Sequence, residues 1–192
     1  MHASLADVMV DLAQNGVEAG AGRLSLLLDE GIDEIKFIVE DDGKGMDAAT
    51  LAKAEDPFWT DGAKHPGRRV GLGIPFLRQT AEQCGGRTDI VSSPGRGTRV
   101  EAVFPAANVD LPPIGDVALL WLQCLSLPGE AGITIRRVLR NPDGVAREYA
   151  IDREEVSEAL GGLEDAGSLG LLREYVRSLE DSLIREEKNE EE

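Results

Sequence analysis

Hydrophobic and polar side chains alternate along the chain with two different periods, that of a helix and that of a strand. Near the amino terminus, apolar residues recur every three to four positions and predict an amphipathic helix over 4–18, with Ser4 as its N-cap. The runs 23–28 and 34–39 are rich in Leu, Ile, Val and Phe and predict two strands that form a hairpin.

Glycine and proline mark the ends of the elements that follow. Two helices and two strands are expected, over 48–54, 74–84, 89–92 and 98–104. The stretch 56–69 has no usable periodicity and predicts a long loop, of a length that is usually functional or mobile. The two strands are joined by the turn 93–97, Ser-Pro-Gly-Arg-Gly.

A stretch with little apolar content, 107–113, predicts a linker. With 192 residues the chain is long enough for two compact modules, so we expect one domain over 1–106 and a small α+β module over 114–186. Its helices and strands are expected over 115–125, 133–140, 145–151, 152–160 and 169–184. We interpret it as a module for docking or for homodimer formation. The acidic end, 187–192, is expected to be disordered.

Charge and hydropathy exclude some functions. Lys and Arg total 20 against 36 Asp and Glu, which gives 20 − 36 = −16 at pH 7. A surface that negative repels phosphodiester backbones, so we expect no nucleic acid as a partner. No apolar run approaches the roughly 20 residues that span a bilayer, and the amino-terminal stretch has no basic leader. A cytoplasmic protein is therefore expected.

Three short motifs carry the candidate chemistry, and their order matters because each alone is weak. They are Asp11 with Asn15, Asp41 with Gly43 and Gly45, and Gly71 with Gly73. The first pair, four residues apart, shares one helix face. The second follows a strand directly, although the same pattern is common in turns where glycine supplies a positive φ. The third precedes a helix, whose first backbone N–H groups bind phosphate well.

In this order, the motifs resemble the GHKL superfamily, named for gyrase, the heat-shock chaperone, histidine kinases and MutL. Two further segments look like parts of the histidine kinase domain: Asp-Pro-Phe-Trp-Thr at 56–60, and the Gly-Gly, Ser-Pro-Gly and Gly-Thr succession at 85–98. The resemblance covers about 4–105. It implies an ATP-binding domain of the Bergerat type, which is an α+β fold: a two-layer α/β sandwich whose mixed, mostly antiparallel sheet carries helices on one face.

The resemblance also implies roles for individual residues. Asn15 would hold a Mg²⁺ ion bridged to the triphosphate, since this hard cation takes oxygen ligands. Asp11 would orient or deprotonate the attacking group, and Asp41 would accept the amino group of adenine. The residues expected to bind ATP are Asn15, Ala19, Asp41, Gly43, Gly45, Met46, Lys64, Arg69, Gly71, Leu72, Gly73 and Thr98.

The chain departs from the family pattern at two positions. Asp11 stands where Glu is more usual, and its side chain is shorter by one methylene group, which would weaken base catalysis. Arg69 replaces the first glycine of the third motif; its planar guanidinium either reaches the γ-phosphate or is simply solvated. Lys64 and Arg68 in the same loop would stabilise the triphosphate or be ordinary surface charge. His65, in that loop, is not expected to accept a phosphoryl group.

Nucleotide binding by itself does not fix the function, because one fold hosts several activities. The segment 56–60 and the third motif favour a stand-alone kinase module that transfers the γ-phosphate to a His or Ser of a partner protein in signalling or regulation. Asp11 and the Glu18-Ala19 pair instead favour an ATPase that drives a conformational change, as in gyrase or MutL. A non-catalytic ATP sensor is the third alternative. We favour the kinase module.

Overall fold

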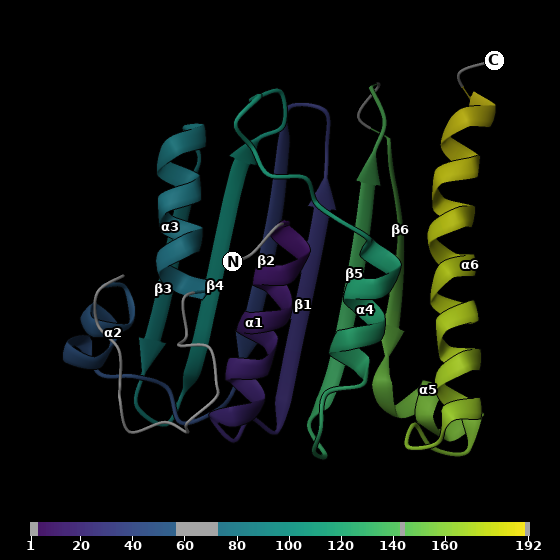
Figure 1. Ribbon diagram of the computed structural model, residues 1–192, viewed down its shortest axis with the longest axis horizontal. Helices are drawn as coiled ribbons and strands as arrows, with labels where there is room; N and C mark the ends of the chain where they lie inside the picture. The colour runs from purple at the N-terminus through teal and green to yellow at the C-terminus, as the bar shows by residue number, and fades with distance from the viewer. Residues whose placement is uncertain (1–3, 57–72, 143–144, 191–192) are drawn as a thin grey trace.

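The computed structural model describes residues 4–56, 73–142 and 145–190, with the backbone alone for 186–190. Its strands form a single sheet (Figure 1). Within these residues the strands are β1 (Arg23–Glu30), β2 (Glu34–Asp41), β3 (Arg87–Ser93), β4 (Gly97–Pro105), β5 (Gly132–Arg140) and β6 (Ala146–Asp152). Their order across the sheet is β3-β4-β2-β1-β5-β6. Neighbouring strands are antiparallel, except that β5 runs parallel to β1.

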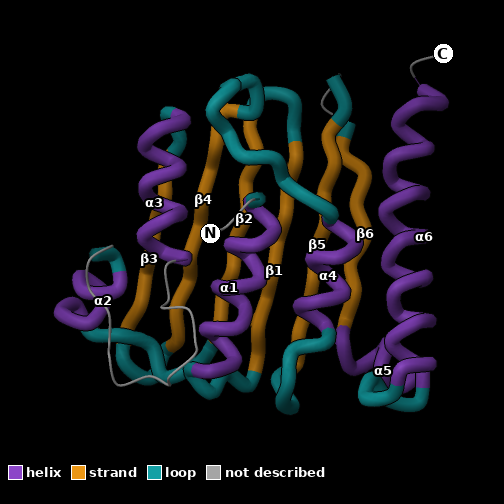
Figure 2. The backbone as a smooth tube through the Cα atoms, viewed as in Figure 1, coloured by secondary structure: helices purple, strands orange, loops and turns teal. Residues whose placement is uncertain are grey.

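The longer helices lie on one face of this sheet (Figure 2). The helices of the described chain are α1 (Leu5–Glu18), α2 (Ala48–Ala54), α3 (Gly73–Cys84), α4 (Val117–Leu125), α5 (Arg153–Leu160) and α6 (Ala166–Glu190). α3, α1, α4 and α6 are arranged side by side across the sheet. The expected fold class, a mixed and mostly antiparallel sheet with helices on one face, is confirmed by this arrangement.

Local sequence explains why α1 and β2 pack as they do. α1 begins with a capping box, in which the Ser4 hydroxyl accepts from the Asp7 N–H and the Asp7 carboxylate accepts from the Ser4 N–H. Its apolar side chains at helical spacing are buried against the sheet. In β2 every second residue, Ile35, Phe37 and Val39, is buried beneath the helices. α1 and β2 therefore form where the pattern predicts them.

The segment expected as a linker, 107–113, is attached to the helices of the first half. The Asn108 side chain donates to the carbonyl oxygen of Cys84 at the end of α3 (2.9 Å). The carbonyl oxygen of Pro113 accepts from the Leu5 N–H at the start of α1 (3.0 Å). The chain thus crosses from β4 to α4 along the helical layer.

The elements beyond that segment extend the sheet of the first half. All of β1 pairs with β5, with Leu24 opposite Ile133. One hydrophobic core includes residues of both halves, among them Leu12, Leu26, Phe37, Trp121, Ile135 and Val176. The domain expected over 1–106 and the module expected over 114–186 therefore share one sheet and one core. Composition indicates where elements break, but not whether strands on either side of the break will pair.

The last helix is longer than its apolar pattern predicts. α6 continues to Glu190, past the start of the tail that was expected to be disordered over 187–192; residues 191–192 lie outside the described part. Glu, Lys and Arg are good helix formers, so they extend a helix that packing has already nucleated. Among the described residues, no helix is both long and apolar enough to span a membrane.

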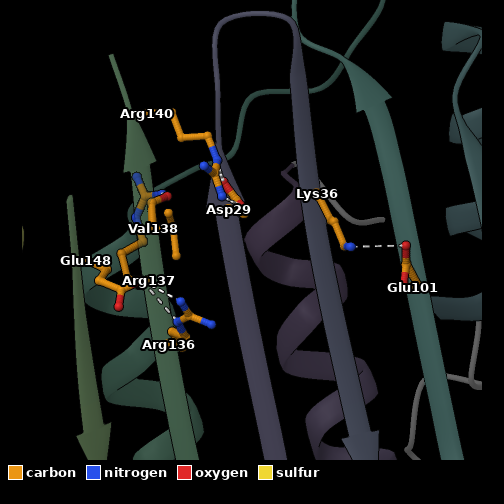
Figure 3. Close-up of polar contacts among 8 residues, drawn as sticks. All are labelled: Asp29, Lys36, Glu101, Arg136, Arg137, Val138, Arg140 and Glu148. Carbon is orange, nitrogen blue, oxygen red and sulfur yellow. Dashed lines mark hydrogen bonds and ion pairs between the residues drawn. The ribbon is translucent and has the colours of Figure 1, made fainter. Parts of the chain in front are cut away.

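The sheet face without helices carries cross-strand ion pairs. Lys36 pairs with Glu101 (3.3 Å), Arg140 with Asp29 (2.7 Å) and Arg136 with Glu148 (2.6 Å), as Figure 3 shows. Such pairs on adjacent strands stabilise a solvated sheet face. Opposite charges therefore neutralise each other along this face.

A buried ionic cluster ties α6 to the sheet on the helical side. The guanidinium of Arg137 in β5 pairs with Glu30 at the end of β1 and with Glu180 of α6. The Tyr149 hydroxyl of β6 donates to the same Glu180. Burial raises the pKa of Tyr149, and the negative charge of the Glu180 carboxylate raises it further. Because Glu30 belongs to the first half of the chain, this cluster joins the two halves.

Candidate functional site

The described motif residues converge at the end of the sheet that is lowest in Figure 1, where α1 ends and α3 begins. The pairing of β2 with β4 places Asp41 opposite Thr98. α1 passes directly over this pair: a Cβ added to Gly16 would lie 3.0 Å from the Asp41 Cβ. The fold thus brings the first two motifs and Thr98 together.

Asp41 is a half-buried carboxylate with a fixed orientation. Its Oδ1 accepts from the Gly43 N–H (2.9 Å). Burial raises the pKa of Asp41, while hydrogen bonds from the backbone of Gly43 and Thr98 act in the opposite direction. A carboxylate held in this way is an oriented hydrogen-bond acceptor, which is what recognition of an amino group requires.

The two glycines of the second motif occupy places where a side chain does not fit. A Cβ at Gly43 would lie 2.9 Å from the Asp41 Oδ1 and 3.0 Å from both the Cβ and the carbonyl oxygen of Ala19. Gly45 has φ +60°, and a Cβ there would lie 1.9 Å from the Ser93 carbonyl oxygen. The backbone of 43–45 therefore passes tightly between the end of α1 and the β3–β4 turn. Because Gly43 and Gly45 have no side chains, neither residue covers the Asp41 carboxylate.

Ser92 is a member of the site that the sequence reasoning missed. Its hydroxyl accepts from the Met46 N–H (2.8 Å) and shares a hydrogen bond with the Thr98 hydroxyl (2.9 Å). Ser92 thereby fixes the end of the second motif against β4. Its position inside the segment 85–98, which resembles part of the histidine kinase domain, could have identified it, but only Thr98 of that segment was assigned a role.

The first motif also reaches the start of α3. A Cβ added to Gly73 would lie 2.4 Å from the Asp11 Oδ2, so the carboxylate rests against the backbone where α3 begins. Asn15, one turn further along α1, is exposed. The structure thus places the expected catalytic carboxylate beside the last glycine of the third motif.

Several predicted site residues fall outside the part of the chain that the structure describes: Lys64, Arg68, Arg69, Gly71 and Leu72. Their proposed contacts with a triphosphate stay predictions. Within the described ranges, no group of three or more His, Cys, Asp and Glu side chains is arranged to hold a metal ion. Among those residues, the candidate metal ligand stays the single amide of Asn15.

Comparison with known proteins places the match in the first half of the chain. A family model described as histidine kinase-, DNA gyrase B-, and HSP90-like ATPase matches residues 2–108. The chain is 34% identical over 104 residues to the sensor protein kinase FleS of Pseudomonas aeruginosa, covering 53% of the chain and 25% of FleS. It is 30% identical over 103 residues to the sensor histidine kinase ZraS of Escherichia coli O157:H7, covering 53% of the chain and 22% of ZraS.

The chain spans a quarter or less of the length of these two relatives (25% and 22%). Among solved structures, it is similar to the catalytic domain of the histidine kinase ThkA, with 19% identity and a TM-score of 0.40 over 52% of this chain and 65% of that one. The match to the family model ends before α4 begins.

Proposed function

Because the chain belongs to the histidine kinase-, DNA gyrase B- and HSP90-like ATPase family, we propose that it binds Mg²⁺-ATP where α1, β2, β4 and α3 meet. The observation that carries the proposal is the half-buried Asp41, oriented by Gly43 and lying opposite Thr98. The glycine positions around it, where a Cβ would collide with protein atoms, fit a loop that lies flat beside a purine. Asp41 would accept the adenine amino group, with the Thr98 hydroxyl beside it.

The residues near α3 would serve the phosphate end. When bound, Mg²⁺-ATP supplies a phosphoryl group whose charge the metal partly neutralises. Mg²⁺ commonly takes one or two protein oxygens and completes its shell with phosphate and water, so the Asn15 amide oxygen fits as its protein ligand. The backbone N–H groups of Gly73 and Ile74, at the start of α3, would face phosphate oxygens, whereas Pro75 has no N–H to offer. Asp11, resting against Gly73, would orient the attacking group.

We propose phosphoryl transfer to a partner protein as the activity of this site. The names of the relatives, a sensor protein kinase and a sensor histidine kinase, support this choice. The partner would carry a His or Ser acceptor in the cytoplasm, and the surface built by α4, α5 and α6 would dock it or a second copy of the chain.

A second candidate, ATP hydrolysis, rests on the same carboxylate, since Asp11 lies at the start of α3 where a water could be activated. The two are separated by incubating the protein with γ-labelled ATP, with and without candidate partner proteins. Label on a partner that depends on Asp11 and Asp41 supports the kinase. Release of labelled phosphate without any labelled partner supports hydrolysis. Tight binding with neither product contradicts both and leaves a sensor.

Asp11→Asn is the informative variant in this assay, because it removes the charge of the proposed catalytic group and keeps its size. We expect it to bind ATP as the wild type does and to lose transfer. Asp152→Asn is the matched control: Asp152, at the end of β6, caps α5 by accepting from two backbone N–H groups, and β1 and β5 lie between β6 and β2 in the sheet. It should bind ATP and transfer phosphate like the wild type.

A further inference from the structure

Asp42, the second residue of the Asp-Asp-Gly-Lys-Gly motif, has a set of contacts that adenine recognition does not explain. Its Oδ1 accepts from the backbone N–H groups of Gly22 (2.7 Å) and Arg23 (2.8 Å). Its Oδ2 pairs with the Arg23 Nε at 3.4 Å. Gly22 lies in the connection from α1 to β1 and Arg23 is the first residue of β1, so both donors lie about twenty residues earlier in the chain.

The connection that Asp42 holds bears directly on the nucleotide site. Its first residue, Ala19, ends α1 and accepts the Lys44 N–H through its carbonyl oxygen (3.0 Å). A Cβ added to Gly43 would lie 3.0 Å from the Cβ and the carbonyl oxygen of Ala19, so the backbone of the second motif packs closely against the end of α1. Any shift of the α1–β1 connection would therefore change how the end of α1 lies against the second motif.

We propose that Asp42 is a positioning residue for nucleotide binding: by holding the N–H groups of Gly22 and Arg23, it sets where α1 ends relative to Asp41. This proposal rests on the proposed function of the site. The end of α1 carries Asn15 and Ala19, whereas β2 delivers Asp41. Asp42, which directly follows β2, bonds to Gly22 in the connection after α1 and to Arg23 at the start of β1. The side chain acts on ATP only through these neighbours.

The charge state of Asp42 suits this task. The backbone N–H of Arg23, followed by that of Gly22 and by the Arg23 guanidinium, holds the pKa of Asp42 below its ordinary value. The acceptor therefore stays ionised throughout the neutral pH range. The amide of an Asn keeps an acceptor oxygen at the same place, whereas Ala removes it.

The same connection also holds the second half of the chain. The carbonyl oxygen of Gly22 accepts from the Gly132 N–H, at the start of β5 (2.9 Å). Gly22 thus bonds to Asp42 on one side and to β5 on the other. A change at Asp42 is therefore transmitted to a backbone segment that joins α1, β1 and β5.

The test measures ATP and inosine triphosphate binding by calorimetry on the full chain, in the wild type, Asp42→Ala, Asp42→Asn, Asp41→Asn and Asp152→Ala. Inosine triphosphate lacks the amino group that Asp41 would accept. Displacing α1 from Asp41 in Asp42→Ala should raise the dissociation constant for ATP about tenfold and reduce the preference for ATP over inosine triphosphate. Asp42→Asn should restore both to within about twofold of the wild type.

Asp152→Ala separates positioning from a general loss of stability. It removes an Asp that likewise accepts from two backbone N–H groups, those of Glu154 (2.8 Å) and Glu155 (3.3 Å). It should lower the thermal midpoint without changing either dissociation constant. Equal ATP affinity in Asp42→Ala and Asp152→Ala, or a failure of Asp42→Asn to restore binding, would overturn the positioning role.

The design also distinguishes this inference from the proposed function. If Asp41→Asn binds ATP as tightly as the wild type, the site assignment itself is overturned. If Asp41→Asn weakens binding while Asp42→Ala does not, only the role of Asp42 is overturned. Peptide-level hydrogen exchange over 20–24 in the free protein gives a readout independent of ATP. It should accelerate in Asp42→Ala and stay unchanged in Asp42→Asn.

Discussion

Two adjacent arginines on β5 should respond very differently to replacement by methionine. Arg137 lies on the helical side, is 2% exposed, and faces the carboxylates of Glu30 and Glu180. Arg136 lies on the open face, where its side chain is 59% exposed beside Glu148. Methionine keeps most of the aliphatic length in both cases. The comparison therefore isolates the charge in a buried and in an exposed setting on the same strand.

The magnitude follows from the partners that remain. Arg137→Met leaves Glu180, itself only 6% exposed, without its cation, and breaking one side of a buried pair costs about 3 to 5 kcal/mol. Arg136→Met breaks an exposed pair worth about 0 to 1 kcal/mol. Urea unfolding at neutral pH measures both values, provided that the slope of free energy against urea stays constant.

A double variant tests the cause of the loss. Replacing both buried partners, as Arg137→Met with Glu180→Leu, should recover a large part of the stability because no uncompensated charge stays in the core. Equal destabilisation by Arg137→Met and Arg136→Met, within about 0.5 kcal/mol, would refute the reasoning. It would mean that the ionic cluster does not hold α6 and β5 to the first half of the chain.

Three further outcomes are expected. Gly45→Ala forces a residue with a Cβ into φ +60° and against the Ser93 carbonyl oxygen, so the thermal midpoint should fall and ATP affinity with it; an unchanged midpoint would contradict the loop geometry. Because burial holds the pKa of Asp41 above 3.8, folding favours its protonated form, and stability is lost as pH rises through that pKa. In the absence of ATP, the urea midpoint of Asp41→Asn should therefore rise relative to that of the wild type as the pH increases from about 3 to about 7. Urea unfolding of both proteins across this pH range checks the trend. In Gly73→Ala the new Cβ displaces the Asp11 carboxylate, so phosphoryl transfer should slow more than ATP binding weakens.

The sequence predicted those features that depend on neighbours along the chain. The N-cap at Ser4, the strand β2 and the glycine positions at Gly43 and Gly45 follow from local rules, and the structure has them in place. Each is set by residues within a few positions of one another. Local patterns were therefore sufficient for these features.

Features that depend on distant pairing were not predicted. β5 pairs with β1 across about a hundred residues, and nothing in the composition of 107–113 says that the chain returns to the same sheet. Arg137 and Arg136 lie on opposite faces of β5. Because β5 has buried residues on both faces, the alternation of its residues does not tell which arginine is buried. Asp42 was assigned no role from the sequence, because its partners Gly22 and Arg23 are identified only by the folded geometry.

The central claim is that the end of the sheet at Asp41 and Asn15 binds Mg²⁺-ATP, and calorimetric titration of the full chain tests it most directly. Losing a hydrogen bond to a charged group costs about 1.5 to 3 kcal/mol. Asp41→Asn should therefore raise the dissociation constant roughly 10- to 100-fold, and Asn15→Ala should weaken binding only when Mg²⁺ is present. Asp29→Asn, on the same sheet but paired with Arg140 at its opposite end, should bind like the wild type. Unchanged affinity in both Asp41→Asn and Asn15→Ala would contradict the assignment of the site.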